Sequence, residues 1–356
     1  MKNILITGGA GFIGSNFVDY IIKSANFDKI IILDKLTYCG SLENLRESKK
    51  DPRFVFIRGD ICDKNLVKHI FHQYSVDTVV NFAAETHVDR SILAPETFIR
   101  TNILGTFNLL ENARKYWEKI SPSSSKVHFH HISTDEVFGS LQKNEAPFTE
   151  DSKYKPNSPY SASKASCDHF IHAYFQTYKL PVTISNCSNN YGPRQFPEKL
   201  IPLMVFNALE GKPIPVYGDG KQIRDWLYVE DHCDAILQIM KNGKPGETYN
   251  VGGDNQTPNI ELIYSVCEIL DELLPNSGYF PHKNLVTFVT DRPGHDRRYA
   301  TDISKINREL NWKPKNNLSD GLRATIQWYL SNTEWVRKIK QKNSYQSWLK
   351  KNYIKR

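Results

Sequence analysis

In the first half of the chain, short apolar runs alternate with longer stretches in which apolar residues recur at helical spacing. The expected strands are 4–7, 30–33, 54–57, 78–82, 127–132 and 181–185, and the expected helices are 12–24, 63–74, 95–117 and 159–178. The apolar runs are nearly continuous and rich in β-branched and aromatic residues, as in parallel strands covered on both faces. Strands that alternate with helices predict βαβ units, so we expect an α/β fold with a doubly wound parallel sheet.

The regular alternation ends near Asn186. Five prolines then follow within a short stretch, at positions 193, 197, 202, 213 and 215. We therefore expect a first domain over 1–186, to which some later segments such as 227–240 return. A smaller, loop-rich α/β lobe over 187–330 would bind the substrate, and a basic C-terminal tail would cover 331–356.

A glycine-rich turn joins the first expected strand to the first expected helix. Gly8, Gly11 and Gly14 are spaced G-x-x-G-x-x-G, and Asp34 ends the second strand twenty residues after Gly14. Glycines allow a tight turn and a close approach of the backbone to a pyrophosphate, which the helix N-terminus attracts. A carboxylate at Asp34 accepts hydrogen bonds from the adenosine ribose and repels a 2′-phosphate. The pattern predicts a Rossmann-type domain that binds NAD+ in preference to NADP+.

Polar residues stand where the fifth expected strand ends. Thr134, Asp135 and Glu136 follow it directly, and Tyr160 and Lys164 lie further on, one helical turn apart on the same face. Ligands bind at strand ends in open α/β sheets, so these side chains are candidates for proton transfer. A nearby ammonium and a positive nicotinamide ring would lower the pKa of Tyr160 from its usual value of about 10. Adjacent carboxylates tend to hold different protonation states, which suits one acid and one base.

The net charge of +7 belongs mainly to the C-terminal tail. After Glu334 the chain carries eight Lys or Arg residues and no acid, so the rest of the chain is close to neutral. We expect this tail to be a solvated helix or a frayed end, and we expect no nucleic-acid partner.

Other features of the sequence indicate a cytoplasmic protein. No apolar run approaches the roughly 20 residues of a membrane span, so we expect no membrane partner. The first apolar run breaks at Gly8 and Gly9, too early for a signal peptide. The six cysteines are scattered without a C-x-x-C pair, which favours neither a disulfide framework nor a metal site.

Long segments of the chain resemble the nucleotide-sugar 4,6-dehydratases, a family within the extended short-chain dehydrogenase/reductase superfamily. The matching segments are 7–14, 34–38, 83–91, 134–139, 160–164, 189–193, 196–202, 224–231 and 292–299. The resemblance covers residues 3 to about 330 and is closest to the family members that act on dTDP-glucose.

This resemblance implies conversion of a nucleotide-linked glucose to its 4-keto-6-deoxy derivative with loss of water. Tyr160 would remove the C4 hydroxyl proton, Thr134 would position that hydroxyl, and hydride would pass from C4 to tightly bound NAD+. Glu136 would then take the C5 proton and Asp135 would protonate the C6 oxygen, after which hydride would return to C6. The cofactor is regenerated in each cycle.

The same resemblance assigns binding residues and an assembly. The cofactor contacts would be Gly8, Gly11, Phe12, Ile13, Gly14, Asp34, Lys35, Thr37, Asp60, Ile61, Phe82, Ala83, Ala84, Thr101, Ser133, Tyr160, Lys164 and Asn189. The substrate contacts would be Thr86, His87, Thr134, Asn189, Lys199, Leu200, Pro215, Tyr217, Arg224, Asn259, Arg292, His295 and Tyr299. A homodimer would form through a four-helix bundle built from segments 95–117 and 159–178 of each subunit.

Three other functions fit part of the pattern. Thymine and uracil differ by one methyl group, worth only about 1–3 kcal/mol in an apolar pocket, so UDP-glucose is the nearest alternative substrate. A UDP-sugar 4-epimerase needs no second acid–base pair, so Asp135 and Glu136 disfavour that function. A non-catalytic NAD-binding regulator would be expected to have lost the catalytic residues that this chain retains.

Overall fold

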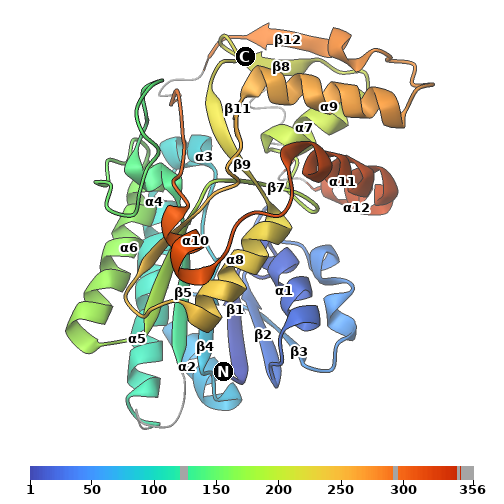
Figure 1. Ribbon diagram of the computed structural model, residues 1–356. Coiled ribbons are helices and arrows are strands. Elements are labelled where there is room, and N and C mark those ends of the chain that lie inside the picture. Colours follow the sequence, from blue (N-terminus) through green and yellow to red (C-terminus); the bar gives the residue numbers. More distant parts are fainter. Residues whose placement is uncertain (121–126, 292–295, 343–344, 346–356) are drawn as a thin grey trace.

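The computed structural model describes residues 1–120, 127–291, 296–342 and 345. At its centre is a seven-stranded parallel sheet with the order β10-β6-β5-β4-β1-β2-β3 (Figure 1). The strands are β1 (Asn3–Thr7), β2 (Lys29–Asp34), β3 (Phe54–Arg58), β4 (Thr78–Asn81), β5 (His128–Thr134), β6 (Val182–Cys187) and β10 (Thr248–Val251). The strand order reverses between β1 and β4, the switch point at which doubly wound sheets bind ligands. The expected doubly wound fold is confirmed.

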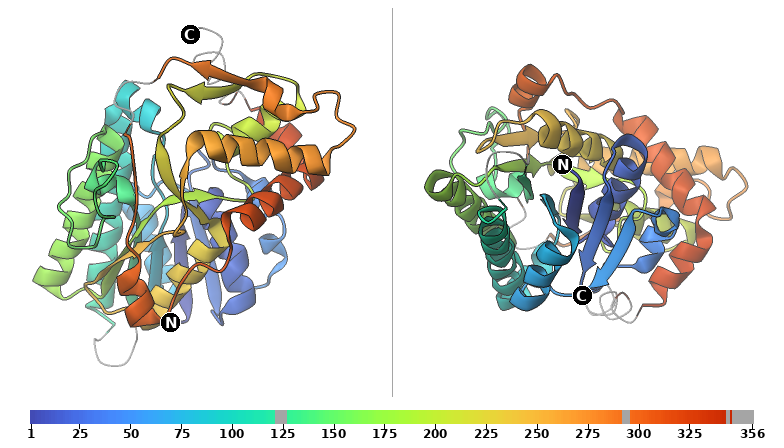
Figure 2. Two further views of the ribbon diagram at one scale, coloured as in Figure 1. Left: turned by 45° about the horizontal axis from the view of Figure 1, so that its top comes forward. Right: turned by 90° about the horizontal axis from the view of Figure 1, so that it is seen from below.

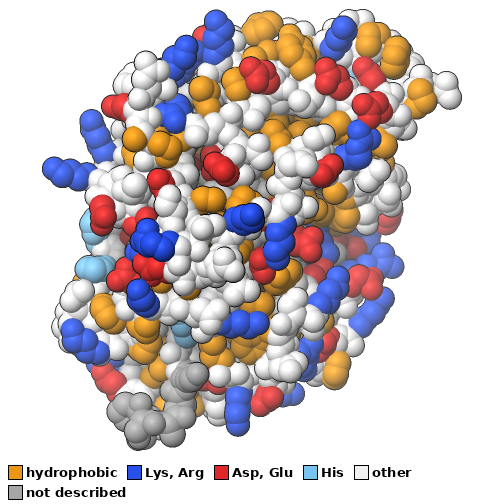
Figure 3. Space-filling model, in the orientation of Figure 1, with side chains coloured by type: hydrophobic (Ala, Val, Ile, Leu, Met, Phe, Trp, Pro, Cys, Tyr) orange, Lys and Arg blue, Asp and Glu red, His pale blue; other side chains and the backbone are white. Residues whose placement is uncertain are grey.

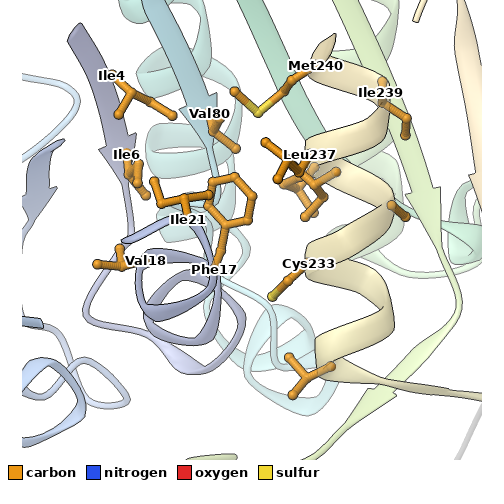
Figure 4. Close-up of a cluster of buried hydrophobic side chains, with 14 of the residues drawn as sticks. Ile4, Ile6, Phe17, Val18, Ile21, Val80, Cys233, Leu237, Ile239 and Met240 are labelled. Carbon is orange, nitrogen blue, oxygen red and sulfur yellow. The ribbon is translucent and has the colours of Figure 1, made fainter. Parts of the chain in front are cut away.

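Each face of the sheet packs on its own set of helices (Figure 2). The helices are α1 (Phe12–Ser24) and α8 (Val229–Asn242) on one face, and α2 (Lys64–Tyr74), α5 (Thr106–Trp117) and α6 (Pro159–Tyr178) on the other. Ile4 and Ile6 of β1 join the core with α1 and α8, whereas Leu5 between them joins the opposite core. Figure 4 shows Phe17 of α1 beside these isoleucines, with Met240 of α8 nearby. Burial on both faces explains why the strands are nearly continuous apolar runs.

The helix expected over 95–117 is divided in the structure. Its parts are α4 (Pro95–Phe98), the π-helical segment η3 (Ile99–Gly105) and α5, and α3 (Val88–Leu93) precedes them. The π-helical segment buries Asn102, whose side chain accepts a hydrogen bond from the Glu85 backbone nitrogen (2.8 Å) and donates one to Ser163 Oγ (2.8 Å). Through these two bonds Asn102 links the π-helical turn to the loop at Glu85 and to Ser163 of α6. π-helical turns occur often near functional sites.

The second lobe is built on two small sheets and its own core. Its strands are β7 (Asn189–Tyr191), β9 (Ile223–Tyr228) and β11 (Gln256–Pro258) in one sheet, and β8 (Ile214–Tyr217) and β12 (Val286–Val289) in the other. Its helices are α7 (Leu200–Leu209), α9 (Asn259–Leu273), α11 (Leu318–Ser331) and α12 (Thr333–Lys340). Met204, Val266 and Leu322, from three of these helices, share one buried cluster.

Several segments after residue 186 belong to the first lobe. The helix α8 spans most of segment 227–240, which we expected to return, and it packs on α1. The strand β10 pairs with β6 at the sheet edge, and α10 (Ser304–Leu310) packs on β10. The chain therefore crosses between the lobes several times. Short single-turn helices complete the fold: η1 (Leu42–Leu45), η2 (Ser48–Lys50), η4 (Asp135–Phe138) and η5 (His282–Leu285).

The basic tail differs from our expectation as far as it is described. We expected a solvated helix or a frayed end, but α12 buries Trp335 and Ile339, which are 7% and 1% exposed, in the core of the second lobe. These two residues lie four apart and share one helix face, while the basic residues lie on other faces. Residues 343–344 and 346–356 lie outside the described part of the chain. On the face drawn in Figure 3, Lys and Arg side chains are interspersed with Asp and Glu.

The described residues bear on two kinds of partner, a membrane and a metal ion. None of the helices in these residues has the length and apolar content needed to cross a bilayer. Over the same residues, no group of three or more His, Cys, Asp or Glu side chains is placed to hold a metal ion.

Candidate active site

A cavity of about 450 Å³ opens at the carboxyl ends of the central strands and is lined by residues of both lobes. Every described residue that we predicted to bind cofactor or substrate lines this cavity, with the single exception of Tyr299. The predicted contacts Arg292 and His295 lie outside the described residues. Residues as far apart in sequence as Gly8 and Asn259 are thus gathered around one cleft.

The glycine turn at the end of β1 packs too tightly for side chains at two of its three glycines. Gly8 has a φ of +69°, and a Cβ atom there would lie 2.7 Å from the backbone nitrogen of Ala83. At Gly14 a Cβ atom would lie 2.4 Å from the carbonyl oxygen of Gly8. At Gly11 the nearest atom would be 3.2 Å away, so the space above the N-terminus of α1 stays open. This cradle, with a helix N-terminus below it, fits a pyrophosphate.

Asp34 is placed to receive an adenosine ribose. One carboxylate oxygen accepts a hydrogen bond from the backbone nitrogen of Ala10 (2.9 Å), and the other accepts one from that of Leu36 (2.7 Å). Burial raises the pKa of Asp34, and these two hydrogen bonds oppose that rise. Nearby, Lys35 pairs with Asp60 at 2.7 Å on the rim of the same cleft. Together with the glycine cradle, these residues fit a dinucleotide.

The acidic pair stands where β5 ends and η4 begins. Thr134 Oγ1 accepts a hydrogen bond from the backbone nitrogen of Glu136 (3.3 Å) and donates one to Asp135 Oδ1 (3.4 Å). Asp135 is 2% exposed, and its Oδ2 has no hydrogen-bond partner among the described residues. Burial, followed by the negative charges of Glu136 and Asp225, raises the pKa of Asp135 well above its usual range. The rise favours the protonated form of Asp135, which suits an acid with a proton to give.

Tyr160 and Lys164 are both buried on α6 beside the acidic pair. Burial, followed by the negative charge of Glu136, raises the pKa of Tyr160 well above 10. Lys164 Nζ donates to the carbonyl oxygen of Ile132 (2.7 Å) and contacts His131 Nε2 (2.9 Å). We expected a nearby ammonium to help lower the pKa of Tyr160, but the surrounding protein groups raise it. The positive nicotinamide ring would have to supply that lowering.

Next to the catalytic residues lies a group of buried polar side chains that we did not predict from the sequence. Asp168 accepts hydrogen bonds from Ser133 Oγ (2.7 Å) and Tyr154 Oη (3.0 Å), and its other oxygen lies 3.8 Å from His131 Nε2. Burial raises the pKa of Asp168 to about 6, and the nearby Lys164 opposes that rise. Two signals were present in the sequence: three histidines within the fifth strand, and an aspartate four residues after the lysine of α6.

Asp168 leads to a prediction about stability and pH. Its folded-state pKa of about 6 lies above its ordinary value of 3.8, so the favourable contribution is present below about pH 4 and is lost as the pH rises through 6. We expect the free energy of unfolding to lose about 3 kcal/mol from this group between those limits. Urea unfolding at several pH values measures the loss. It should disappear in Asp168→Asn and persist in Asp151→Asn, which changes an exposed aspartate. The same pH dependence in wild type and Asp168→Asn would contradict the raised pKa.

The second lobe contributes the residues expected to hold the substrate. Arg224 is buried and donates to the carbonyl oxygens of Ile223 (2.7 Å) and Asp296 (2.9 Å). Its guanidinium carbon lies 4.5 Å from the ring centre of Tyr299, whose hydroxyl donates to Asp296. The structure therefore places Tyr299 next to Arg224 and not among the residues that line the cavity. A direct contact of Tyr299 with substrate therefore stays a prediction.

Two buried amides face the cavity with unused hydrogen-bonding capacity. The Oδ1 atoms of Asn189 and Asn259 have no hydrogen-bond partner among the described residues, and both side chains line the cavity. Buried polar atoms without partners are uncommon, so these two are suited to receive a ligand. Glu198, which we did not predict, also lines the cavity and pairs with Arg90 at 3.2 Å. Glu198 lies within segment 196–202, one of the segments that resemble the 4,6-dehydratases. The resemblance therefore indicated this region of the chain but not this carboxylate.

Comparison with known proteins assigns the chain to a family. The model of the family described as GDP-mannose 4,6 dehydratase matches residues 5–325. The chain belongs to this family. The resemblance to nucleotide-sugar 4,6-dehydratases that we drew from the motifs is therefore confirmed.

Individual relatives are similar over nearly their full length. A dTDP-glucose 4,6-dehydratase from Salmonella typhimurium is 52% identical over 359 residues, covering 98% of each chain. The crystal structure of dTDP-glucose 4,6-dehydratase from Bacillus anthracis in complex with NAD is 46% identical with a TM-score of 0.83, covering 95% of this chain and 100% of that one. A UDP-glucose 4-epimerase structure from Thermotoga maritima also aligns, at 30% identity and a TM-score of 0.81, over 93% and 99% of the two chains. Dehydratases and epimerases thus share this fold, and the site must discriminate between them.

Proposed function

We propose that this protein converts dTDP-glucose to dTDP-4-keto-6-deoxyglucose and water, with NAD+ as a cofactor that is regenerated in each cycle. The observation that carries the proposal is the acidic pair at the end of β5, beside Tyr160. Asp135 is buried and its protonated form is favoured, whereas Glu136 is only partly buried, so one group can donate a proton while the other accepts one. Dehydration needs both functions, and 4-epimerisation needs neither.

Bound NAD+ supplies the redox step, by accepting hydride from C4 of the sugar and returning it at C6. Tyr160 takes the proton of the C4 hydroxyl, which Thr134 orients. The resulting C4 carbonyl makes the C5 proton acidic, and Glu136 removes it. Asp135 protonates the departing C6 oxygen, which leaves as water. Glu136 then returns its proton to C5 as C6 is reduced, and exchange with water moves the proton gained by Tyr160 back to Asp135.

The nucleotide is tested by giving the purified protein dTDP-glucose and UDP-glucose in separate reactions. The alkali-induced absorbance of a 4-keto sugar reports turnover, and we expect product from dTDP-glucose at the higher kcat/KM. The contribution of one methyl group to this ratio is about 10- to 200-fold. A higher kcat/KM with UDP-glucose would reverse the nucleotide assignment. Conversion of UDP-glucose to UDP-galactose without loss of water would replace the dehydratase by an epimerase.

We also propose a homodimer, formed where α5 and α6 of two subunits pack as a four-helix bundle. The two helices contact each other within one subunit and carry Phe107 and Phe170, each 41% exposed, with ring centres 6.2 Å apart. Leu104 of η3 is 54% exposed on the adjoining turn. Large exposed apolar side chains that gather on one face are typical of association surfaces.

The dimer leads to a prediction about Phe107. In Phe107→Asp a carboxylate would be buried between subunits, so the dimer dissociation constant should rise at least about 100-fold. Sedimentation velocity over a concentration series measures it. Phe288→Asp is the matched control, because Phe288 is 57% exposed on β12 in the other lobe. A wild-type monomer, or equal effects of the two substitutions, would contradict the proposed interface.

A cytoplasmic location is the last part of this proposal. All six cysteines are free thiols, four of them buried. Thiols kept in this state are typical of a reducing compartment.

A further inference from the structure

The basic C-terminal segment, which the proposed function leaves unexplained, packs against the cofactor-binding region. Trp335 Nε1 donates a hydrogen bond to Asn44 Oδ1 (2.7 Å), and these residues are 291 positions apart. Lys338 pairs with Glu43 at 3.0 Å. Lys342, just beyond α12, donates to the carbonyl oxygen of Gly40 (2.8 Å). All three contacts reach the segment 36–45, which follows β2 and ends in η1.

The segment 36–45 is in turn bonded to the glycine cradle. The backbone nitrogen of Ser41 and the side-chain amide of Asn44 both donate to the carbonyl oxygen of Ala10, at 3.0 and 2.9 Å. The backbone nitrogen of Ala10 donates to Asp34 at 2.9 Å. Two hydrogen bonds therefore connect Trp335 to Ala10, and a third continues to the carboxylate that would receive the adenosine ribose.

Lys342 lies behind the segment 36–45 as seen from the cofactor cleft. Thr37, Tyr38 and Gly40 line the main cleft, and the same three residues line a second, shallow cavity of about 410 Å³. Lys342 lines that second cavity and does not line the main cleft. The segment therefore separates Lys342 from the cleft, and Lys342 reaches it through the hydrogen bond to Gly40 and through its positive charge, which opposes the rise in the pKa of Asp34.

The same helix is fastened to the second lobe. Lys340 pairs with Glu210 at the end of α7, and its ammonium lies 4.6 Å from the ring centre of Phe206. Trp335 and Ile339 are buried in the core that α7, α9 and α11 share. The helix α12 therefore bridges the two lobes, with one set of contacts on each.

We propose that α12 and Lys342 form a strap that holds the segment 36–45 against the cofactor and slows release of NAD+. Trp335 and Lys342 are positioning residues, because they act through Asn44 and Gly40 and do not line the cofactor cleft. The inference rests on the proposed function only in that the cofactor is NAD+. The strap also gives a role to three basic residues of the described tail, Lys338, Lys340 and Lys342.

The test compares Trp335→Phe and Lys342→Met with wild type. Phenylalanine keeps an aromatic ring in the core but lacks the indole N–H, which leaves Asn44 Oδ1 without its donor. We expect NAD+ to dissociate about tenfold faster from either variant, a change within the range for a hydrogen bond whose remaining partner is left unsatisfied. Equilibrium dialysis and the decay of bound-NADH fluorescence measure the change. Hydrogen exchange of residues 36–45 should also accelerate, whereas kcat at saturating NAD+ should stay unchanged.

Two further variants sharpen the experiment. Arg337→Met is the matched control, because Arg337 lies on α12 and its hydrogen bonds within the described residues go to Glu334 and Gln341 of the same segment. Lys342→Arg keeps a donor for the Gly40 carbonyl oxygen and should restore retention. Lys342→Met involves no core packing and therefore keeps the test valid if Trp335→Phe is unstable.

The outcomes separate the strap from the proposed function. Unchanged NAD+ release and unchanged exchange in both Trp335→Phe and Lys342→Met would overturn the strap, and so would an equal effect of Arg337→Met. Wild-type protein that holds NAD+ tightly but makes no keto sugar would overturn the proposed function and leave the strap standing. Wild-type protein that does not bind NAD+ would overturn both.

Discussion

Glu136→Gln should still oxidise C4 of the sugar but should stop before water is lost. Glutamine cannot take the C5 proton, whereas Tyr160 and Thr134, which serve the first step, are untouched. Loss of a general base typically costs about 10²- to 10⁴-fold in rate, and we expect turnover to fall within that range. Mixing the variant with dTDP-glucose should produce the near-ultraviolet absorbance of reduced nicotinamide, which should then persist.

The control for this variant is Glu145→Gln, which changes an exposed glutamate outside the cavity. It should turn over like wild type and show no lasting absorbance. Normal product formation by Glu136→Gln would show that another group removes the C5 proton. Failure of the variant to reduce its cofactor would place Glu136 in the first step and would contradict the roles that we assign.

Tyr160→Phe should block the reaction one step earlier. This variant lacks the phenol that we propose as the acceptor of the C4 hydroxyl proton, so hydride cannot leave C4 readily. We expect a fall in turnover of about 10²- to 10⁴-fold, with no build-up of reduced nicotinamide when substrate is added. Rapid mixing with absorbance detection therefore distinguishes this variant from Glu136→Gln, although both are slow.

The pH profile adds an independent check on Tyr160. Burial and the charge of Glu136 raise the pKa of this tyrosine, so the protein by itself disfavours the phenolate. The positive charge of bound NAD+ should lower it again. Wild type should therefore show a rate of cofactor reduction that rises with pH, and Tyr160→Phe should lose that rise. Tyr264→Phe, which changes an exposed tyrosine of α9, should behave like wild type. A rise that survives in Tyr160→Phe would assign the base to another group.

Sequence reasoning located most of the first lobe because its signals are local. The helix α1 spans Phe12–Ser24 as expected, since its limits depend on a glycine turn and on apolar residues at helical spacing. The start of α6 could also be predicted from the sequence, because Ser158 caps the helix and Pro159 occupies its first turn. The division of segment 95–117 into α4, η3 and α5 could not be predicted from the sequence. Its π-helical turn accompanies the bonds of Asn102 to Glu85 and Ser163, which only the folded chain brings together.

The sequence by itself determined the fold class, the cofactor fingerprint and the residue types at the end of β5. These follow from periodicity, glycine spacing and the rule that parallel strands end at one edge of a sheet. Only the tertiary structure decided how far the pKa of Asp135 is raised, because the largest cause of that rise is burial, to which Asp225 of β9 adds its charge. It also decided where the described part of the basic tail packs. Trp335 and Asn44 meet across 291 positions of sequence, a contact that no local pattern encodes.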